Sequence, residues 1–150
     1  SEAARAIELL DRCSLDEKHL RRVSPMLCGY LNAYKKFKAE CRFIPTQIEK
    51  KIENKQYGYQ GRLDRVGLFH GKECLADFKT GIVAPATRLQ LALYGYALDP
   101  KRWWPRLGVQ LKPDGSYQCV PYDVREWPSD LATALACVRV ALWKAKHHLI

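Results

Sequence analysis

The sequence predicts an α/β (α+β) protein with one central sheet of about five strands flanked by helices, in a single domain spanning residues 1–150. Two observations lead to this class. The chain has the length of one ordinary domain, and 47% of its residues are apolar, which is enough for one hydrophobic core. The predicted elements follow the order helix, three-stranded meander, helix, two strands, helix, with no internal repeat or interior linker.

Helices are predicted near the start, in the middle and at the end of the chain. Ser14-Leu15-Asp16-Glu17 has the form of a capping box, so a helix should begin there, and Pro25 should kink or restart it. The helix that continues from Met26 should place an apolar stripe in the core, rather than form a base-stacking platform, through Leu27, Tyr30, Leu31, Tyr34 and Phe37. Further helices are expected at about residues 86–98 and from near Pro128, the last one burying Leu131, Leu135, Val138 and Leu142.

Strands are predicted at about residues 46–54, 58–68 and 72–79, and two more should flank the turn Pro113-Asp114-Gly115. The dipeptide His70-Gly71 suits the two-residue primed turns of hairpins. With such a turn Phe69 pairs with Lys72, and the same register places Asp64 opposite Asp77.

The formal net charge of +9 indicates a polyanionic partner, because lysine and arginine supply most of the non-specific affinity for nucleic acid. A well-solvated basic surface is the alternative. No apolar run approaches the roughly 18 residues that cross a bilayer, and no apolar signal segment is present, so an intracellular protein with no membrane partner is expected. The six cysteines are scattered without zinc-type spacing and are expected to be buried free thiols.

An acidic residue two positions before a lysine occurs four times, as Asp16-x-Lys18, Glu49-x-Lys51, Glu53-x-Lys55 and Asp77-x-Lys79. Only the last follows a strand start that looks buried, Leu75-Ala76, and runs into Thr80-Gly81. Strand alternation should direct Lys79 to the face that carries Asp64 and Asp77.

This face of two acids and one base predicts metal-dependent phosphodiester hydrolysis. Two opposed carboxylates repel unless a cation or a raised pKa intervenes, and they can hold Mg²⁺ (or Mn²⁺) while leaving positions for water and phosphate. Lys79 could orient the attacking water or offset charge in the transition state. A surface ion triad of Asp64, Asp77 and Lys79 is the alternative interpretation.

Three motifs in this order resemble those of RecB-like PD-(D/E)XK nucleases, including viral exonuclease relatives: Gly61-Arg62-Leu63-Asp64, Asp77-Phe78-Lys79-Thr80-Gly81 and Gln90-Leu91-Ala92-Leu93-Tyr94. They look like the G-x-x-D, D-x-K-T-G and Q-x-x-x-Y motifs of that family, and the resemblance covers about residues 49–98. It implies a restriction-endonuclease-like core with a central mixed sheet. It also implies that Asp64, Asp77 and the Phe78 carbonyl bind the metal and that Lys79 is catalytic.

The same resemblance implies roles for other residues. Glu49 would be the acidic residue of the preceding strand, and Gln90 and Tyr94 would touch the substrate strand or brace the site. The hairpin register, apart from the resemblance, places Arg62 across from Lys79, where it could grip a phosphate. From the residues alone, Glu49 is equally a solvated charge on an edge strand, Gln90 and Tyr94 an ordinary helix face, and Arg62 an exposed salt-bridging residue.

One departure from the family pattern concerns a G-x-x-x-H motif that relatives commonly carry on a first helix, with the His four residues before a Glu. Here Ala4 stands four residues before Glu8. The predicted function is a Mg²⁺- or Mn²⁺-dependent deoxyribonuclease, as an exonuclease acting on single- or double-stranded DNA ends. The missing His motivates the alternative of a catalytically inactive nucleic-acid-binding module on a nuclease fold. A protein-interaction domain is a third hypothesis, and the sequence carries no signal for an oligomeric state.

Overall fold

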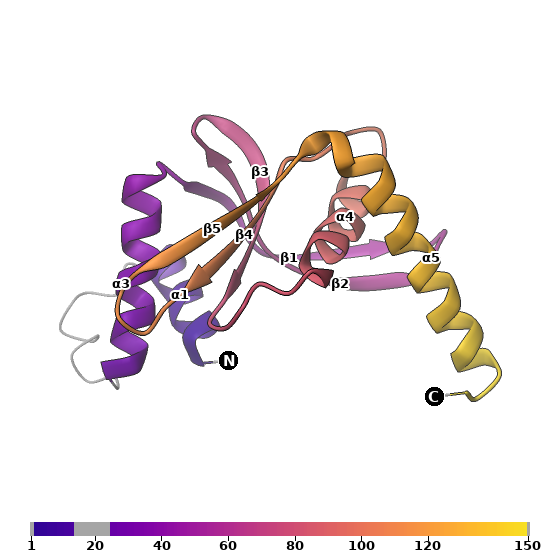
Figure 1. Cartoon of the computed structure of the whole chain (residues 1–150), viewed down its shortest axis with the longest axis horizontal. Helices are drawn as coiled ribbons and strands as arrows, with labels where there is room; N and C mark the ends of the chain where they lie inside the picture. Colours follow the sequence, from indigo (N-terminus) through magenta and orange to yellow (C-terminus); the bar gives the residue numbers. More distant parts are fainter. Residues whose placement is uncertain (1, 14–24, 150) are drawn as a thin grey trace.

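The computed structural model describes residues 2–13 and 25–149 and confirms the predicted fold class, an α+β protein with a single mixed five-stranded sheet between helices (Figure 1). The strands are β1 (Ile44–Asn54), β2 (Tyr59–Phe69), β3 (Lys72–Lys79), β4 (Arg106–Leu111) and β5 (Tyr117–Tyr122), in the spatial order β1-β2-β3-β4-β5. Neighbours are antiparallel except β3 and β4, which are parallel. A parallel pair needs a crossover, which helix α4 (Ala86–Leu98) supplies.

Helices cover both faces of this sheet. Helices α1 (Glu2–Cys13) and α3 (Pro25–Glu40) lie over one face, whereas α4 and α5 (Trp127–Lys146) lie over the other (Figure 1). A short 3-10 helix, η1 (Val124–Glu126), leads into α5. Helix α3 begins at Pro25, where the sequence predicted a kink or a restart, and the helix expected to begin at the capping box lies outside the described residues.

The apolar stripe of α3 packs in the core as its spacing predicted. Leu31, Tyr34 and Phe37 are fully buried, and Phe37 packs edge-on against Phe78 of β3. The core on the other face gathers Leu63 and Val66 of β2 around the inner side of α4. Each face of the sheet therefore has its own apolar cluster, and the sheet is the layer that both clusters share.

The two-residue turn at His70-Gly71 is confirmed. Both residues have positive φ values, 50° and 78°, and Phe69 pairs with Lys72. Positive φ at both central positions is typical of the primed turn that fits the twist of a hairpin, and Gly71 adopts it at no steric cost.

Strand β2 changes faces at Asp64. Leu63 belongs to the core beneath α4, whereas Arg65, two residues later, reaches Asp11 of α1 on the opposite side. Strict alternation would place both side chains on one face. Across the β1–β2 ladder, the residue beside this change of face is Glu49, whose φ of 50° is unusual for a non-glycine residue within a strand.

Two expectations about burial need correction. In α5 the fully buried positions are Trp127, Asp130 and Ala134, whereas Leu131, Leu135 and Val138 are half-buried and Leu142 is 47% exposed. The reason is that the body of the protein covers α5 mainly near its N-terminal end. Among the cysteines, Cys74 is buried as expected, but Cys137 is exposed on α5. Within the described part of the chain, no helix combines the length and apolarity that a membrane crossing requires.

Candidate active site

The hairpin of β2 and β3 brings Asp64 beside Asp77. Its ladder runs in the predicted register from Phe69–Lys72 to Arg65–Ala76 and ends one step before the two acids. Beyond that point the Phe78 N–H donates to a side chain instead of to a main-chain carbonyl of β2, because the Asp64 Oδ2 accepts its hydrogen bond at 2.9 Å. Where the β2–β3 ladder ends, the Asp64 carboxylate therefore lies between the two strands.

Asp77 is the buried member of this pair, with 5% of its surface exposed. Burial, followed by the negative charge of Asp64, raises the pKa of Asp77 to about 7. Lys79 opposes this shift, since its Nζ lies 3.1 Å from Asp77 Oδ2 and confirms that both side chains share a face. Oδ2 nevertheless has no well-aligned hydrogen-bond donor among the described residues. A buried carboxylate oxygen in this condition is suited to a cation.

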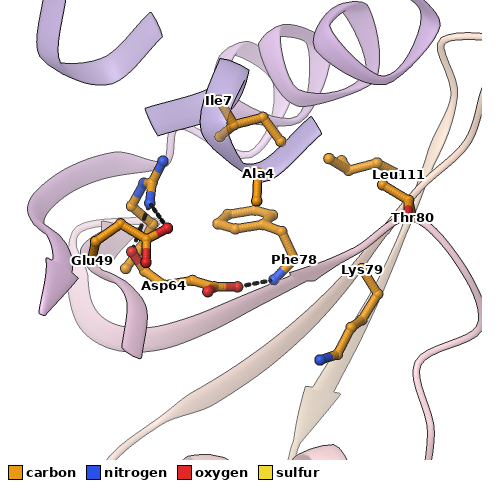
Figure 2. A pocket seen from close by; sticks show the side chains of 9 residues that line it. Ala4, Ile7, Glu49, Asp64, Phe78, Lys79, Thr80 and Leu111 are labelled. Atoms are coloured by element: carbon orange, nitrogen blue, oxygen red, sulfur yellow. Dashed lines mark hydrogen bonds and ion pairs between the residues drawn. The ribbon is translucent and has the colours of Figure 1, made fainter. Parts of the chain in front are cut away.

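A cavity of about 240 Å³ opens beside these acids (Figure 2). Figure 2 shows Glu49 and Asp64 next to each other along one wall, while Lys79 extends away from them. Asp77 does not contribute to the wall. The lining comes from α1, the four strands β1 to β4 and the residue that follows β3, through Ala4, Ile7, Glu49, Asp64, Arg65, Phe78, Lys79, Thr80 and Leu111.

Glu49 lies in the wall of this cavity, with only 15% of its side chain exposed. Burial and, next, the charge of Asp64 raise the pKa of Glu49. Arg65 NH1 lies 3.8 Å from Glu49 Oε1 and partly compensates that charge. The structure therefore places Glu49 with the predicted site residues and not on a solvated strand edge.

A buried ion network that the sequence pattern did not predict lies behind the cavity. Arg65 and Asp11 each have 1% of the side chain exposed, and Arg65 Nε donates to Asp11 Oδ2 at 2.8 Å. Arg65 NH1 also donates to the Asp64 carbonyl at 2.7 Å, while Lys38 and the Tyr34 hydroxyl donate to Asp11. A signal was present, because Arg65 is a charged residue between the apolar Leu63 and Val66 of a strand predicted to be buried.

The third motif joins the other two through Tyr94. Gln90 Nε2 donates to the Tyr94 hydroxyl at 2.8 Å, and a Cβ on Gly61 would lie 2.8 Å from a Tyr94 ring carbon, so only glycine fits there without a shift. Burial raises the pKa of Tyr94, and the charges of Asp77 and Asp64 raise it further. The structure thus packs Gly61 of the first motif against Tyr94 of the third, whose hydroxyl is within the electrostatic influence of the two acids.

Arg62 lies apart from this cluster. The ladder with β3 has ended before Arg62 is reached, so it does not stand across from Lys79, and its cross-strand partner is Lys51 of β1. The two basic residues line a separate open cavity of about 640 Å³ with Gln60 and Glu53. The predicted register fails here because the strands separate at the acids.

A divalent cation fits the donors present, although no three His, Cys, Asp or Glu side chains of the described residues converge into a metal-holding group. Mg²⁺ commonly uses only one or two carboxylates and takes its remaining ligands from water and phosphate. Asp64 and Asp77 would supply those carboxylates. The Phe78 carbonyl is suited to join them, because the N–H and C=O of a strand residue point the same way and the Phe78 N–H points to Asp64.

Neither the comparison with models of protein families nor the comparison with curated proteins found a match for this chain.

Proposed function

We propose that this protein is a Mg²⁺- or Mn²⁺-dependent deoxyribonuclease that hydrolyses phosphodiester bonds at DNA ends. The observation that supports it most is the pairing of buried Asp77, whose Oδ2 has no aligned donor among the described residues, with Asp64 and with Lys79 at 3.1 Å. The predicted motif residues Gly61 and Tyr94 pack against each other, and the charges of the same acids raise the pKa of Tyr94.

Each residue of the site has a task in this proposal. Asp64 and Asp77 hold the cation, and the Phe78 N–H keeps the Asp64 carboxylate in place. The bound cation would polarise the phosphodiester and lower the pKa of the attacking water. Lys79 orients that water or offsets the charge that develops on the phosphate. Glu49, in the cavity wall, can accept a proton from water, and its raised pKa suits that role.

The direct test uses DNA labelled at the 5′ or 3′ end, single- or double-stranded, with Mg²⁺, Mn²⁺ or EDTA. Cleavage is expected only with a metal ion, and the position of the released label reports the polarity. Asp77→Ala should lower the rate by about 100-fold or more because it removes a metal ligand. Asp114→Ala, an exposed carboxylate in the β4–β5 turn, is the matched control and should cleave normally. Cleavage in EDTA, or by Asp77→Ala at the wild-type rate, contradicts the proposal.

A second candidate is a nucleic-acid-binding module without turnover, and the position of Ala4 favours it. Ala4 lies in the cavity wall with Glu49, Asp64 and Lys79, at the position where the family resemblance implies a histidine. An alanine methyl group can neither transfer a proton nor bind phosphate. This hypothesis predicts metal-independent DNA binding without cleavage by the wild-type chain, and the appearance of metal-dependent cleavage in Ala4→His. Wild-type cleavage that Ala4→His leaves unchanged would exclude it.

A further inference from the structure

Past the end of the β2–β3 ladder, strands β1 and β2 continue as a two-stranded hairpin of residues 50–63, which we call the arm. The arm reaches past β3 towards α5 (Figure 1). One of its faces packs against α4, where Ile52 and Leu63 are buried. The opposite face is exposed and lines the open cavity of about 640 Å³ through Lys51, Glu53, Gln60 and Arg62.

Two cations oppose each other on this open face of the arm. Lys51 and Arg62 are direct partners in the register of β1 and β2, and like charges in such positions repel each other. Neither side chain forms an ion pair with any residue that the structure describes, and this includes Glu53, the acid of the same face. An anion bound between the two bases would relieve their repulsion, as a cation would for Asp64 and Asp77.

The two bases lie one step along the strands from the candidate metal site. Arg62 precedes Asp64 by two residues and Lys51 follows Glu49 by two, and two strand residues span about 6.6 to 6.8 Å. The charge of Arg62 is near enough to act on the Glu49 carboxylate, where it opposes the effects of burial and of Asp64 on the pKa. A DNA strand bound at the metal site can therefore place its next phosphate between Lys51 and Arg62.

The lining of this cavity suits a sugar-phosphate backbone better than a base. Arginine presents a planar fork of donors that matches two phosphate oxygens, and lysine adds a point charge. The amide of Gln60 can bond to a sugar or phosphate oxygen. Base stacking needs aromatic rings, and none of the described residues that line the cavity is aromatic. Contacts of this kind bind DNA without reading its sequence.

We propose that Lys51 and Arg62 form a phosphate clamp, which holds the phosphate next to the one bound at Asp64 and Asp77. One DNA strand then runs from the acids along the open face of the arm. The clamp rests on the proposed function, in which the acids bind the phosphate that is hydrolysed, and it adds the path of the neighbouring nucleotide. Its two bases position the strand and do not touch the reacting phosphate.

Fluorescence anisotropy of a labelled single-stranded oligonucleotide in EDTA tests the clamp without cleavage. The double variant Lys51→Gln/Arg62→Gln should weaken binding about tenfold or more, because charged hydrogen bonds to a phosphate are lost. It should also make the salt slope shallower by about one unit, since one phosphate is no longer neutralised.

The matched control for binding is Lys72→Gln/Lys101→Gln. It removes the same charge from two exposed lysines that line neither this cavity nor the one beside the acids, so its affinity should stay close to that of the wild type. Equal weakening of the two double variants would overturn the clamp, because net charge alone would then explain the loss. Unchanged binding by Lys51→Gln/Arg62→Gln would overturn it as well, and so would a wild type that binds no DNA.

An uncharged linkage in the substrate tests where the clamp lies relative to the cleaved bond. A methylphosphonate is placed at successive linkages from the end of an oligonucleotide, and cleavage is measured with Mg²⁺ or Mn²⁺. At one linkage next to the cleaved bond it should slow the wild type about tenfold or more. In Lys51→Gln/Arg62→Gln the same linkage should cause little further loss, because both changes remove one interaction. Additive losses would overturn the clamp.

The two experiments separate the clamp from the proposed function. DNA binding that depends on Lys51 and Arg62, with no cleavage in either metal ion, would contradict the proposed function alone and support the clamp as a DNA contact. Wild-type cleavage that Lys51→Gln/Arg62→Gln lowers no more than Lys72→Gln/Lys101→Gln does would overturn the clamp alone.

Discussion

A carboxylate that is both buried and charged needs compensation, and Asp77 receives only part of it from within the chain. Lys79 pairs with its Oδ2, but burial and the neighbouring Asp64 outweigh that pair and raise the pKa of Asp77 to about 7. Without a cation, the protein therefore holds Asp77 protonated over part of the range in which an exposed aspartate would be charged. This single residue links the candidate chemistry to stability.

The first prediction concerns the stability of metal-free protein as a function of pH. Because the pKa of Asp77 is raised in the folded state, the folded protein binds the proton of Asp77 more tightly than the unfolded chain does. The contribution of Asp77 to the free energy of unfolding is therefore greatest below its ordinary pKa of 3.8 and is lost as the pH rises through about 7. Asp77→Asn stays neutral and should avoid this loss, so in EDTA it should exceed the wild type at neutral pH by on the order of 1 to 3 kcal/mol. Urea unfolding across this pH range provides the measurement.

Asp114→Asn is the matched control for that series. Hydrogen bonds from Ser116 lower the pKa of Asp114, so its charged form favours folding and the amide should bring no gain as the pH rises. A parallel response of the two variants to pH would contradict the role assigned to Asp77.

Among the elements, α1 is tied to the candidate site by one buried ion pair. Asp11 of α1 accepts from Arg65 of β2 at 2.8 Å, and Arg65 in turn holds the Asp64 carbonyl and lies near Glu49. Helix α1 forms part of the cavity wall, and this network attaches α1 to the strands that carry Asp64 and Glu49. Few apolar contacts could specify that placement as narrowly as these directed bonds do.

The second prediction is that Asp11→Asn lowers the free energy of unfolding by roughly 3–5 kcal/mol, because it leaves the Arg65 guanidinium buried without its counter-charge. Glu40→Gln, which removes the exposed partner of Lys36, should cost at most about 1 kcal/mol. Denaturant unfolding of both variants compares them. Similar losses would show that burial of the Asp11 pair has no special weight.

Several elements could be predicted from local sequence, and the reasons are physical. Helix α4 was predicted at residues 86–98 and the β2–β3 turn at His70-Gly71, because helical periodicity and primed-turn residues act over short distances. The change of face at Asp64 and the pairing of Arg65 with Asp11 depend on residues far apart in sequence, and no local pattern encodes them. The same limit explains Leu142. It continues the apolar spacing of α5, but it lies in a turn of the helix that the rest of the protein does not cover.

The candidate site shows the same division. Counting the register from the turn correctly predicted that Asp64 lies beside Asp77, because strand pairing is rigid near a tight turn. Strand alternation correctly predicted that Lys79 and Asp77 lie on the same face. The register failed for Arg62, because the strands separate once the Asp64 side chain replaces the ladder bond. The family resemblance implied a place for Glu49 in the site, but the strand pattern alone left it equally on a solvated edge, because its inward turn accompanies a positive φ that the sequence does not signal.

At the scale of the whole molecule, charge is the property most relevant to a polyanionic partner. The net charge of +9 includes the pair of Arg62 and Lys51 on β2 and β1, whose side chains line an open cavity next to the hairpin that carries Asp64. Bases on neighbouring strands that face such an opening can follow a phosphate backbone without sequence preference.

The third prediction is therefore that DNA affinity falls steeply with salt, with log K declining linearly against log salt at about −0.9 per neutralised phosphate. Arg62→Gln should make this slope shallower by about one unit if Arg62 contacts a phosphate. Fluorescence anisotropy of a labelled oligonucleotide at several salt concentrations gives both slopes. Affinity that stays constant from low to physiological salt would point to a partner other than nucleic acid.

The most direct test of the central claim, that Asp64 and Asp77 together bind a divalent cation, is the melting temperature of wild type and Asp64→Asn in Mg²⁺, Mn²⁺ and EDTA. A ligand that binds only the folded state stabilises it by RT ln(1 + [L]/Kd), about 2.7 kcal/mol at a hundredfold excess over Kd. The wild type should melt at a higher temperature with either metal than in EDTA. Asp64→Asn, which keeps the shape and loses the charge, should show a much smaller rise. Equal shifts in the two proteins, or no shift in the wild type, would contradict the claim.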